Sequence, residues 1–132
     1  GSRFLATPEA ITVTGYKHAV VSTAARPEDP TVLSTDYTGK QCRVLRNAYT
    51  EQWRKTPREK LPFGPSLMRS IGDGANHLGC DETYPGPIDI SREFMPIGQC
   101  ARSLRSVVPA GQLVQDIAWG MHAWLQSTRA RL

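Results

Sequence analysis

The stretch TVLSTDYTGKQCRVLR, residues 31–46, indicates the fold class of this chain. Residues 31–35 and 41–46 are rich in β-branched and aliphatic side chains, and the five residues between them include Gly39. Two β-prone runs joined by a short loop that contains glycine are typical of a β-hairpin. We therefore expect an antiparallel sheet in the N-terminal third of the chain.

Residues 11–24, which precede the hairpin, are predicted to form a third strand. Their first four residues, ITVT, are β-branched and alternate in polarity, and Gly15 marks a bend. A short helix is expected before this strand, because residues 7–9 combine an N-cap threonine, a proline at the first helical position and an early acid. Pro27 and Pro30 then separate the strand from the hairpin.

The part of the chain after the hairpin favours helices. Short helices are predicted from residue 50, from a capping-box pattern at 56–59, over 66–71 and over 97–108. Residues 72–96 are rich in glycine and proline and are predicted to be irregular. A long irregular connection of this kind often carries a binding or active site.

The longest helix is predicted to follow Pro109, because apolar residues recur there at helical spacing. We call them the apolar stripe; its members are Leu113, Val114, Ile117, Ala118, Met121, Trp124 and Leu125. We expect the stripe to face the interior and this helix to be the main core element. Early strands followed by helices indicate an α+β fold, with a small antiparallel sheet packed against short helices and a long C-terminal amphipathic helix.

Length and composition predict one soluble domain over residues 1–132, since 39% of the residues are hydrophobic and 21% are charged. No run approaches the roughly 20 apolar residues of a membrane helix. Gly1 and Ser2 resemble a cloning scar, so we expect the chain to be excised from a longer protein. The sequence favours a cytoplasmic location only slightly and leaves the oligomeric state open.

The three cysteines, Cys42, Cys80 and Cys100, do not form a disulfide framework by their number or spacing. We expect reduced thiols, with a bridge between Cys80 and Cys100 as the alternative. The sequence has no glycine-rich phosphate loop and no dinucleotide fingerprint, so we predict no cofactor.

Charge is distributed unevenly along the chain. Residues 40–60 carry seven basic and two acidic side chains, a balance of +5, whereas residues 73–93 have a balance of −4. A basic segment with interleaved aromatics is able to bind a phosphate backbone and stack on bases, and pairing with the acidic segment is the alternative use of its charge. The candidate polyanion-binding residues are Lys40, Arg43, Arg46, Arg54, Lys55, Arg58 and Lys60.

A second candidate site lies in the irregular segment. Cys80 as nucleophile, His77 as base and Asp81 as the orienting acid form a possible catalytic set. His77 and Cys80 are also zinc-ligand types, but no paired ligand motif supports a metal site and we predict none. His18 is a further acid–base candidate on the predicted first strand.

These observations predict a small binding domain that contacts a protein or polyanionic partner through residues 40–60. Two alternatives remain open. The first is a small hydrolase or nuclease, of the toxin or effector type, that uses His77 and Cys80 or His18. The second is a structural subunit that packs on another chain through its C-terminal helix.

Overall fold

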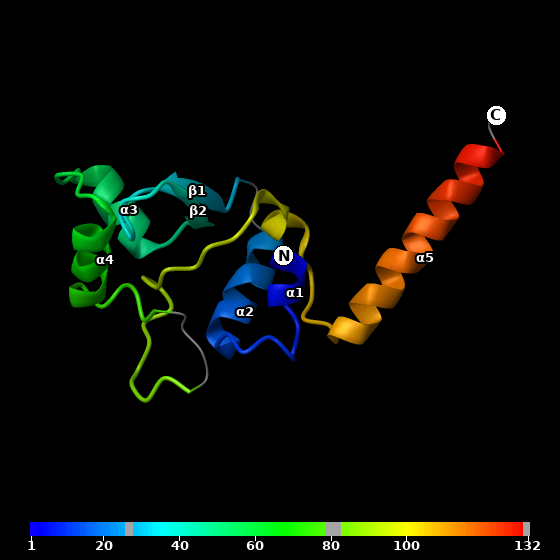
Figure 1. Cartoon of the computed structure of the whole chain (residues 1–132), viewed down its shortest axis with the longest axis horizontal. Coiled ribbons are helices and arrows are strands. Elements are labelled where there is room, and N and C mark those ends of the chain that lie inside the picture. The colour runs from blue at the N-terminus through cyan, green and yellow to red at the C-terminus, as the bar shows by residue number, and fades with distance from the viewer. Residues whose placement is uncertain (26–27, 79–82, 131–132) are drawn as a thin grey trace.

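The protein is described from a computed structural model, and the structure describes residues 1–25, 28–78 and 83–130. The α+β fold predicted from the sequence is confirmed, with a small antiparallel sheet, short helices and a long C-terminal helix (Figure 1). In chain order the elements are α1 (Ser2–Leu5), α2 (Thr14–Ser22), the 3-10 turn η1 (Thr23–Ala25), β1 (Thr31–Ser34), β2 (Cys42–Leu45), α3 (Ala48–Lys55), α4 (Phe63–Gly72), the 3-10 turn η2 (Gln99–Ser103) and α5 (Ala110–Arg129).

The predicted hairpin is confirmed. Strands β1 and β2 pair antiparallel, in a register that sets Thr31 opposite Leu45. In the connecting loop Gly39 has φ +74° and donates its N–H to the Thr35 carbonyl at 2.8 Å. A Cβ atom at Gly39 would approach the Leu61 carbonyl oxygen to 2.6 Å, so both conformation and space require glycine here.

The third strand predicted over residues 11–24 is wrong, because residues 14–22 form helix α2. Tyr16 and Val20, four residues apart, lie on one face of this helix and enter the core. The Tyr16 hydroxyl also donates to the Pro96 carbonyl at 2.6 Å. Contacts with a segment 80 residues away therefore outweigh the β-propensity of the short ITVT run.

The helix predicted to start at residues 7–9 is also wrong. Helix α1 ends at Leu5, and the Thr7 hydroxyl donates back to the Phe4 carbonyl at 2.8 Å. Thr7 thus closes a turn after α1 and does not open a new helix. Two residues further on, the Glu9 carboxylate accepts the backbone N–H of Ala110, at the start of α5.

Helices α3 and α4 agree with the predictions from residue 50 and over 66–71, although both begin earlier. Asn47 caps α3, because its side-chain oxygen accepts the N–H groups of Tyr49 and Thr50, each at 3.1 Å. The helix predicted from the pattern at 56–59 is absent, since these residues are non-helical and Arg58 reaches across to α4.

The helix predicted over 97–108 is reduced to the five-residue turn η2. Ala101 and Leu104 are buried there, but the Val108 N–H bonds to the Ala6 carbonyl at 3.4 Å instead of continuing a helical ladder. Between the end of α4 at Gly72 and the isolated β-bridge that pairs Pro96 with Val44, the described residues are irregular, as predicted.

Two small hydrophobic clusters form the interior. The first joins α2, β2 and the segment around η2 and contains Ala6, Tyr16, Val20, Leu45, Met95, Ile97, Ala101 and Leu104. The second lies between the hairpin and α3 and contains Tyr37, Val44, Tyr49 and Ala75. Among the buried core residues, α5 contributes Leu113.

The expectation that α5 is the main core element is wrong. The helix projects away from the body and contacts it near its first turn (Figure 1). A repeat at helical spacing determines that one face is apolar, but it does not determine which surface covers that face. None of the described helices has both the length and the apolar character that crossing a membrane requires.

Candidate functional site

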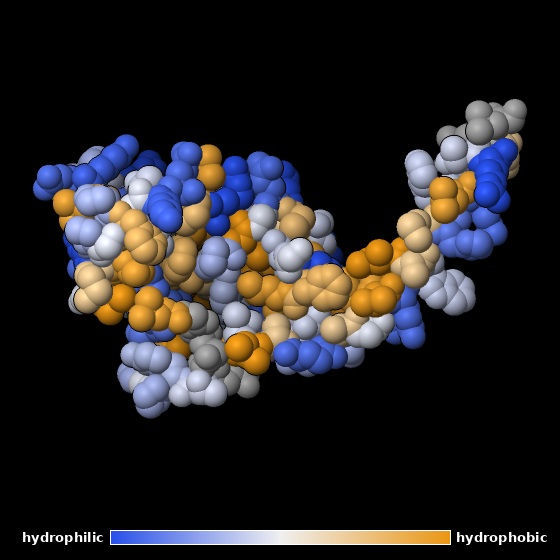
Figure 2. Space-filling view, viewed as in Figure 1, coloured by the Kyte–Doolittle hydropathy of each residue, from blue (hydrophilic) through white to orange (hydrophobic). Residues whose placement is uncertain are grey.

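The apolar stripe on α5 is the most prominent exposed feature of the described structure. Ile117, Met121 and Trp124 expose 54%, 61% and 64% of their surface. Figure 2 shows hydrophobic side chains along the helix where it leaves the body. Monomeric proteins rarely expose large contiguous apolar patches, and such patches mark interaction sites.

The base of α5 is attached to the body by three local contacts. Leu113 is buried, Val108 bonds to Ala6, and the Glu9 carboxylate accepts the Ala110 N–H at 3.0–3.1 Å. This backbone hydrogen bond lowers the pKa of Glu9. A carboxylate suits the positive end of the helix dipole, so Glu9 supplies the cap that Pro109, the N-cap residue, does not.

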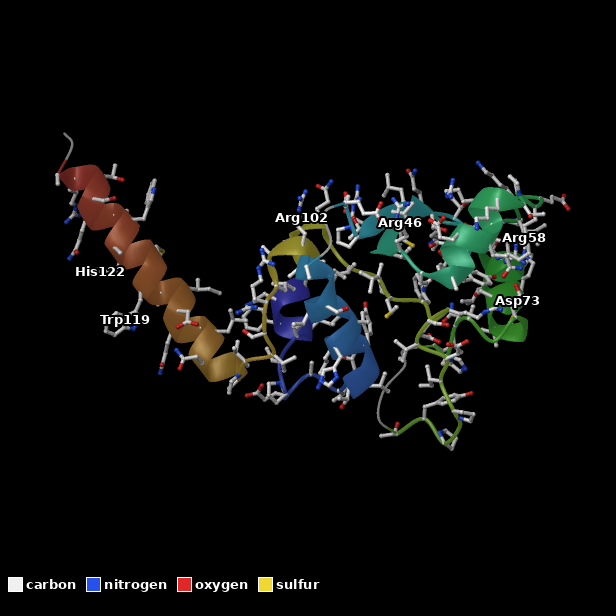
Figure 3. The ribbon with its side chains drawn as sticks, turned by 180° about the vertical axis from the view of Figure 1, so that it is seen from behind. Arg46, Arg58, Asp73, Arg102, Trp119 and His122 are labelled. Carbon is white, nitrogen blue, oxygen red and sulfur yellow. The ribbon has the colours of Figure 1, made fainter. Side chains whose placement is uncertain are left out.

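A hollow of about 380 Å³ lies on another side of α5, lined by Ala118, Trp119 and His122. Trp119 is 77% exposed, and Figure 3 shows it with His122 on the projecting helix. His122 is hydrogen-bonded to Gln126 at 2.8 Å. Apolar surface therefore extends beyond the stripe.

A larger hollow, of about 520 Å³, lies between α2, the end of β2, the start of α3 and the segment at 90–95. Its rim is polar, because the Arg46 guanidinium pairs with Glu51 at 3.3 Å. Arg54 also donates to Glu51, and this contact lowers the pKa of the carboxyl. The lining residues are Ala19, Leu45, Arg46, Asn47, Ala48, Glu51, Ile90, Ser91 and Met95.

Arg58 is the most enclosed member of the basic segment. Its guanidinium stacks over the Trp53 ring at 3.5 Å, donates to Asp73 at 2.8 Å and donates to the Tyr49 hydroxyl. Burial raises the pKa of Tyr49 to about 12, and its hydrogen bond to Asp73 adds to this shift. The contact joins the basic segment to the acidic segment, which is the intramolecular pairing weighed from the sequence (Figure 3).

Other cations of the basic segment also have partners within the chain. Arg43 donates to the Thr31 hydroxyl at 2.9 Å and lies 3.9 Å from Asp29. Lys40 lies over the Phe63 ring at 4.6 Å. Lys55 and Lys60 are exposed. The seven predicted residues thus spread over the hairpin, α3 and the following loop, and the acids Asp29, Glu51 and Asp73 are interspersed among them.

The second predicted site is described only in part. Cys80 and Asp81 lie outside the residues that the structure describes. The His77 imidazole pairs through Nδ1 with Glu93, whose side chain is 1% exposed, and the His77 backbone N–H donates to the same carboxylate at 3.1 Å. The His77 ring also meets Tyr84 edge-on at 4.7 Å. His18 lies elsewhere, exposed on α2.

The described residues contain no group of three metal-ligating side chains that would hold an ion. Cys42 and Cys100 are free thiols. Burial raises the pKa of the Cys42 thiol, which disfavours the nucleophilic thiolate.

Comparison with known proteins gives a likeness in fold. No family model and no curated protein matches the chain. The whole chain superposes on part of FabK from Thermotoga maritima, with a TM-score of 0.72 and 22% identity, and on a point mutant of that protein with a TM-score of 0.63 and 23% identity. The chain spans 39% and 35% of those two chains. At this identity the likeness shows the fold alone.

Sequence reasoning missed three features of these sites. The exposure of the stripe depends on how α5 packs against the rest of the chain, which a local sequence pattern does not determine. The scarcity of charged residues in 110–129 is the one sequence signal that could have indicated it. Glu93, 16 residues from His77, carries no local signal of their pairing. The 520 Å³ hollow brings together three separate parts of the chain, around residues 19, 45–51 and 90–95.

Proposed function

We propose that this chain is a structural and interaction module that binds a protein surface through the apolar stripe on α5. The observation that carries the proposal is the exposure of Ile117, Met121 and Trp124 along a helix that leaves the body. Aromatic and Met side chains are enriched at the centres of protein interfaces, where charged residues are depleted. Residues 110–129 include only two charged side chains, Asp116 and Arg129.

The first test replaces Met121 and Trp124 together by glutamate. Because both side chains are more than half exposed, the double variant should keep its far-UV circular dichroism and unfold within about 1 kcal/mol of the parent. It should lose most of the fluorescence that the parent induces in an apolar dye, together with any concentration-dependent self-association in sedimentation velocity.

The matched control places the same two charges on the polar face, as Gln115→Glu with Gln126→Glu. This variant should bind dye and sediment like the parent. Equal behaviour of the two variants would contradict the proposal, because charge and not apolar surface would then control association. Global unfolding of the Met121 and Trp124 variant would instead indicate that the stripe is buried in the core of the protein.

Polyanion binding through the basic segment and hydrolysis by His77 and Cys80 stay predictions. The first has less support because Arg43, Arg46 and Arg58 already have acidic partners within the chain. The second awaits evidence that the Cys80 thiol meets the His77 imidazole.

A further inference from the structure

The angular width of the stripe restricts the kind of surface that covers it. At 100° per residue, its members spread over an arc of about 140° around α5. A two-stranded coiled coil needs only a narrow seam at two positions per heptad, whereas a helix that packs on a globular core presents a wider arc. A single partner helix would therefore leave part of the stripe in water.

The scarcity of charge on α5 also disfavours pairing between two copies of this helix. Coiled coils carry opposite charges beside the seam that select and orient partners, whereas α5 has only Asp116 and Arg129. A surface that covers the arc has to be apolar and concave, built from more than one helix or strand.

The total surface of the chain indicates the size of the missing contact. Its accessible area is 8212 Å², whereas a compact monomer of 14.6 kDa has about 6,900 Å². The excess is about 1,300 Å², counted over both of the surfaces that a compact fold would bring together. This total is the size of an ordinary specific interface, which buries about 1,200–2,000 Å² in all.

Helix α5 needs such a contact for its own stability. It contains Gly120 in its interior, which costs about 1 kcal/mol relative to alanine, and most of the stability of helices in proteins comes from tertiary packing of their apolar face. Beyond the buried Leu113, the body supplies little packing.

We infer that the stripe is covered, in the intact protein, by a concave apolar surface of a larger body that belongs to the same polypeptide. The inference rests on the proposed function and names the partner. The fold likeness supports this choice over a second copy, because the whole chain matches only 35–39% of FabK and most of the FabK fold has no counterpart here.

The test measures hydrogen exchange of α5 amides in the polypeptide encoded by the complete reading frame, and in the 132-residue chain. In the complete polypeptide we expect α5 amides to exchange at least about 100-fold more slowly than in the short chain, at every protein concentration and with the polypeptide monomeric. Met121→Glu with Trp124→Glu should abolish this protection, and Gln115→Glu with Gln126→Glu should preserve it.

Two results would overturn the inference in distinguishable ways. Protection that appears only at concentrations where the protein dimerises would identify a second copy as the partner, and the proposed docking role of the stripe would survive. Rapid exchange of α5 under all conditions, or a reading frame that encodes no further folded body and a protein that stays monomeric, would leave the stripe uncovered and would refute both proposals.

Discussion

Replacing His77 by alanine tests whether the pair formed by His77 and Glu93 stabilises the irregular segment. Glu93 is 1% exposed, and the substitution removes the imidazole beside its carboxylate. Removing one partner so that a buried polar group loses its hydrogen bond costs about 1–3 kcal/mol, and more when the group left behind is charged. The His77 backbone N–H still donates to Glu93 in the variant, so we expect a loss near 3 kcal/mol.

A loss of this size is a large part of the 5–15 kcal/mol that stabilises a typical domain. For a chain of this length it corresponds to a fall in Tm of about 10 °C. Urea denaturation at pH 7, followed by far-UV circular dichroism and tryptophan fluorescence, measures the free energy of unfolding directly.

His18→Ala and His122→Ala provide matched controls, because both side chains are exposed. Each should change the free energy of unfolding by less than about 0.5 kcal/mol. The double variant His77→Ala with Glu93→Gln should be more stable than His77→Ala alone, since a neutral amide costs less to bury than an unpaired carboxylate. If His77→Ala costs no more than the controls, or Glu93→Gln gives no rescue, the pair does not stabilise the fold as argued.

Two predictions concern the cluster around Arg58. Burial raises the pKa of Asp73, but hydrogen bonds from Arg58 and Tyr49 outweigh burial and hold that pKa below its usual 3.8. The stability that ionised Asp73 gives to the folded state should be present above pH 4 and should be lost as the pH falls through the lowered pKa. Urea midpoints measured from pH 5 to pH 2 should therefore decline less steeply in Asp73→Asn than in the parent. The pKa of Tyr49 is raised to about 12, so the folded state holds the hydroxyl proton more tightly than the unfolded state does. The stability that results is present below pH 10 and should be lost between pH 10 and pH 12. Tyr49→Phe should make this alkaline decline less steep. An unchanged acid slope in the first variant, or an unchanged alkaline slope in the second, would argue against these contacts.

The sequence was informative where local chemistry determines structure. The hairpin follows from two β-prone runs and from Gly39, whose backbone conformation and limited space exclude other residues. Helix α5 follows from its apolar repeat, and α3 from the helical pattern predicted from residue 50, although the structure starts it at Ala48. In each case the signal lies within a few residues of the element that it specifies.

The sequence was misleading where contacts with distant parts of the chain determine the secondary structure. Residues 14–22 are helical because Tyr16 and Val20 pack on segments far along the chain. The capping-box pattern at 56–59 does not start a helix, because Arg58 stacks on Trp53 of α3 and forms an ion pair with Asp73 at the end of α4. The ion pair spans 15 residues and the bond from Tyr16 to Pro96 spans 80, so neither is visible in a window of ten residues.

The candidate sites follow the same division. The sequence suggested Asp81 as the carboxylate partner of His77, and Asp81 lies outside the described residues. In the described part of the chain His77 pairs with Glu93. The basic residues are concentrated in sequence, yet folding places Asp29, Glu51 and Asp73 among them. Net charge along a segment therefore overstates the charge that a partner meets.

This dispersal of charge strengthens the case for the apolar stripe as the interaction surface. In the body Arg43, Arg46, Arg54 and Arg58 pair with nearby acids, whereas α5 has two charged residues in 20 and exposes its largest apolar side chains to water. Glu9 and Leu113 fix only the base of the helix. Under the proposed function, the rest of α5 gains free energy of packing when a partner covers the stripe, and the orientation of the helix and the binding of that partner are then determined together.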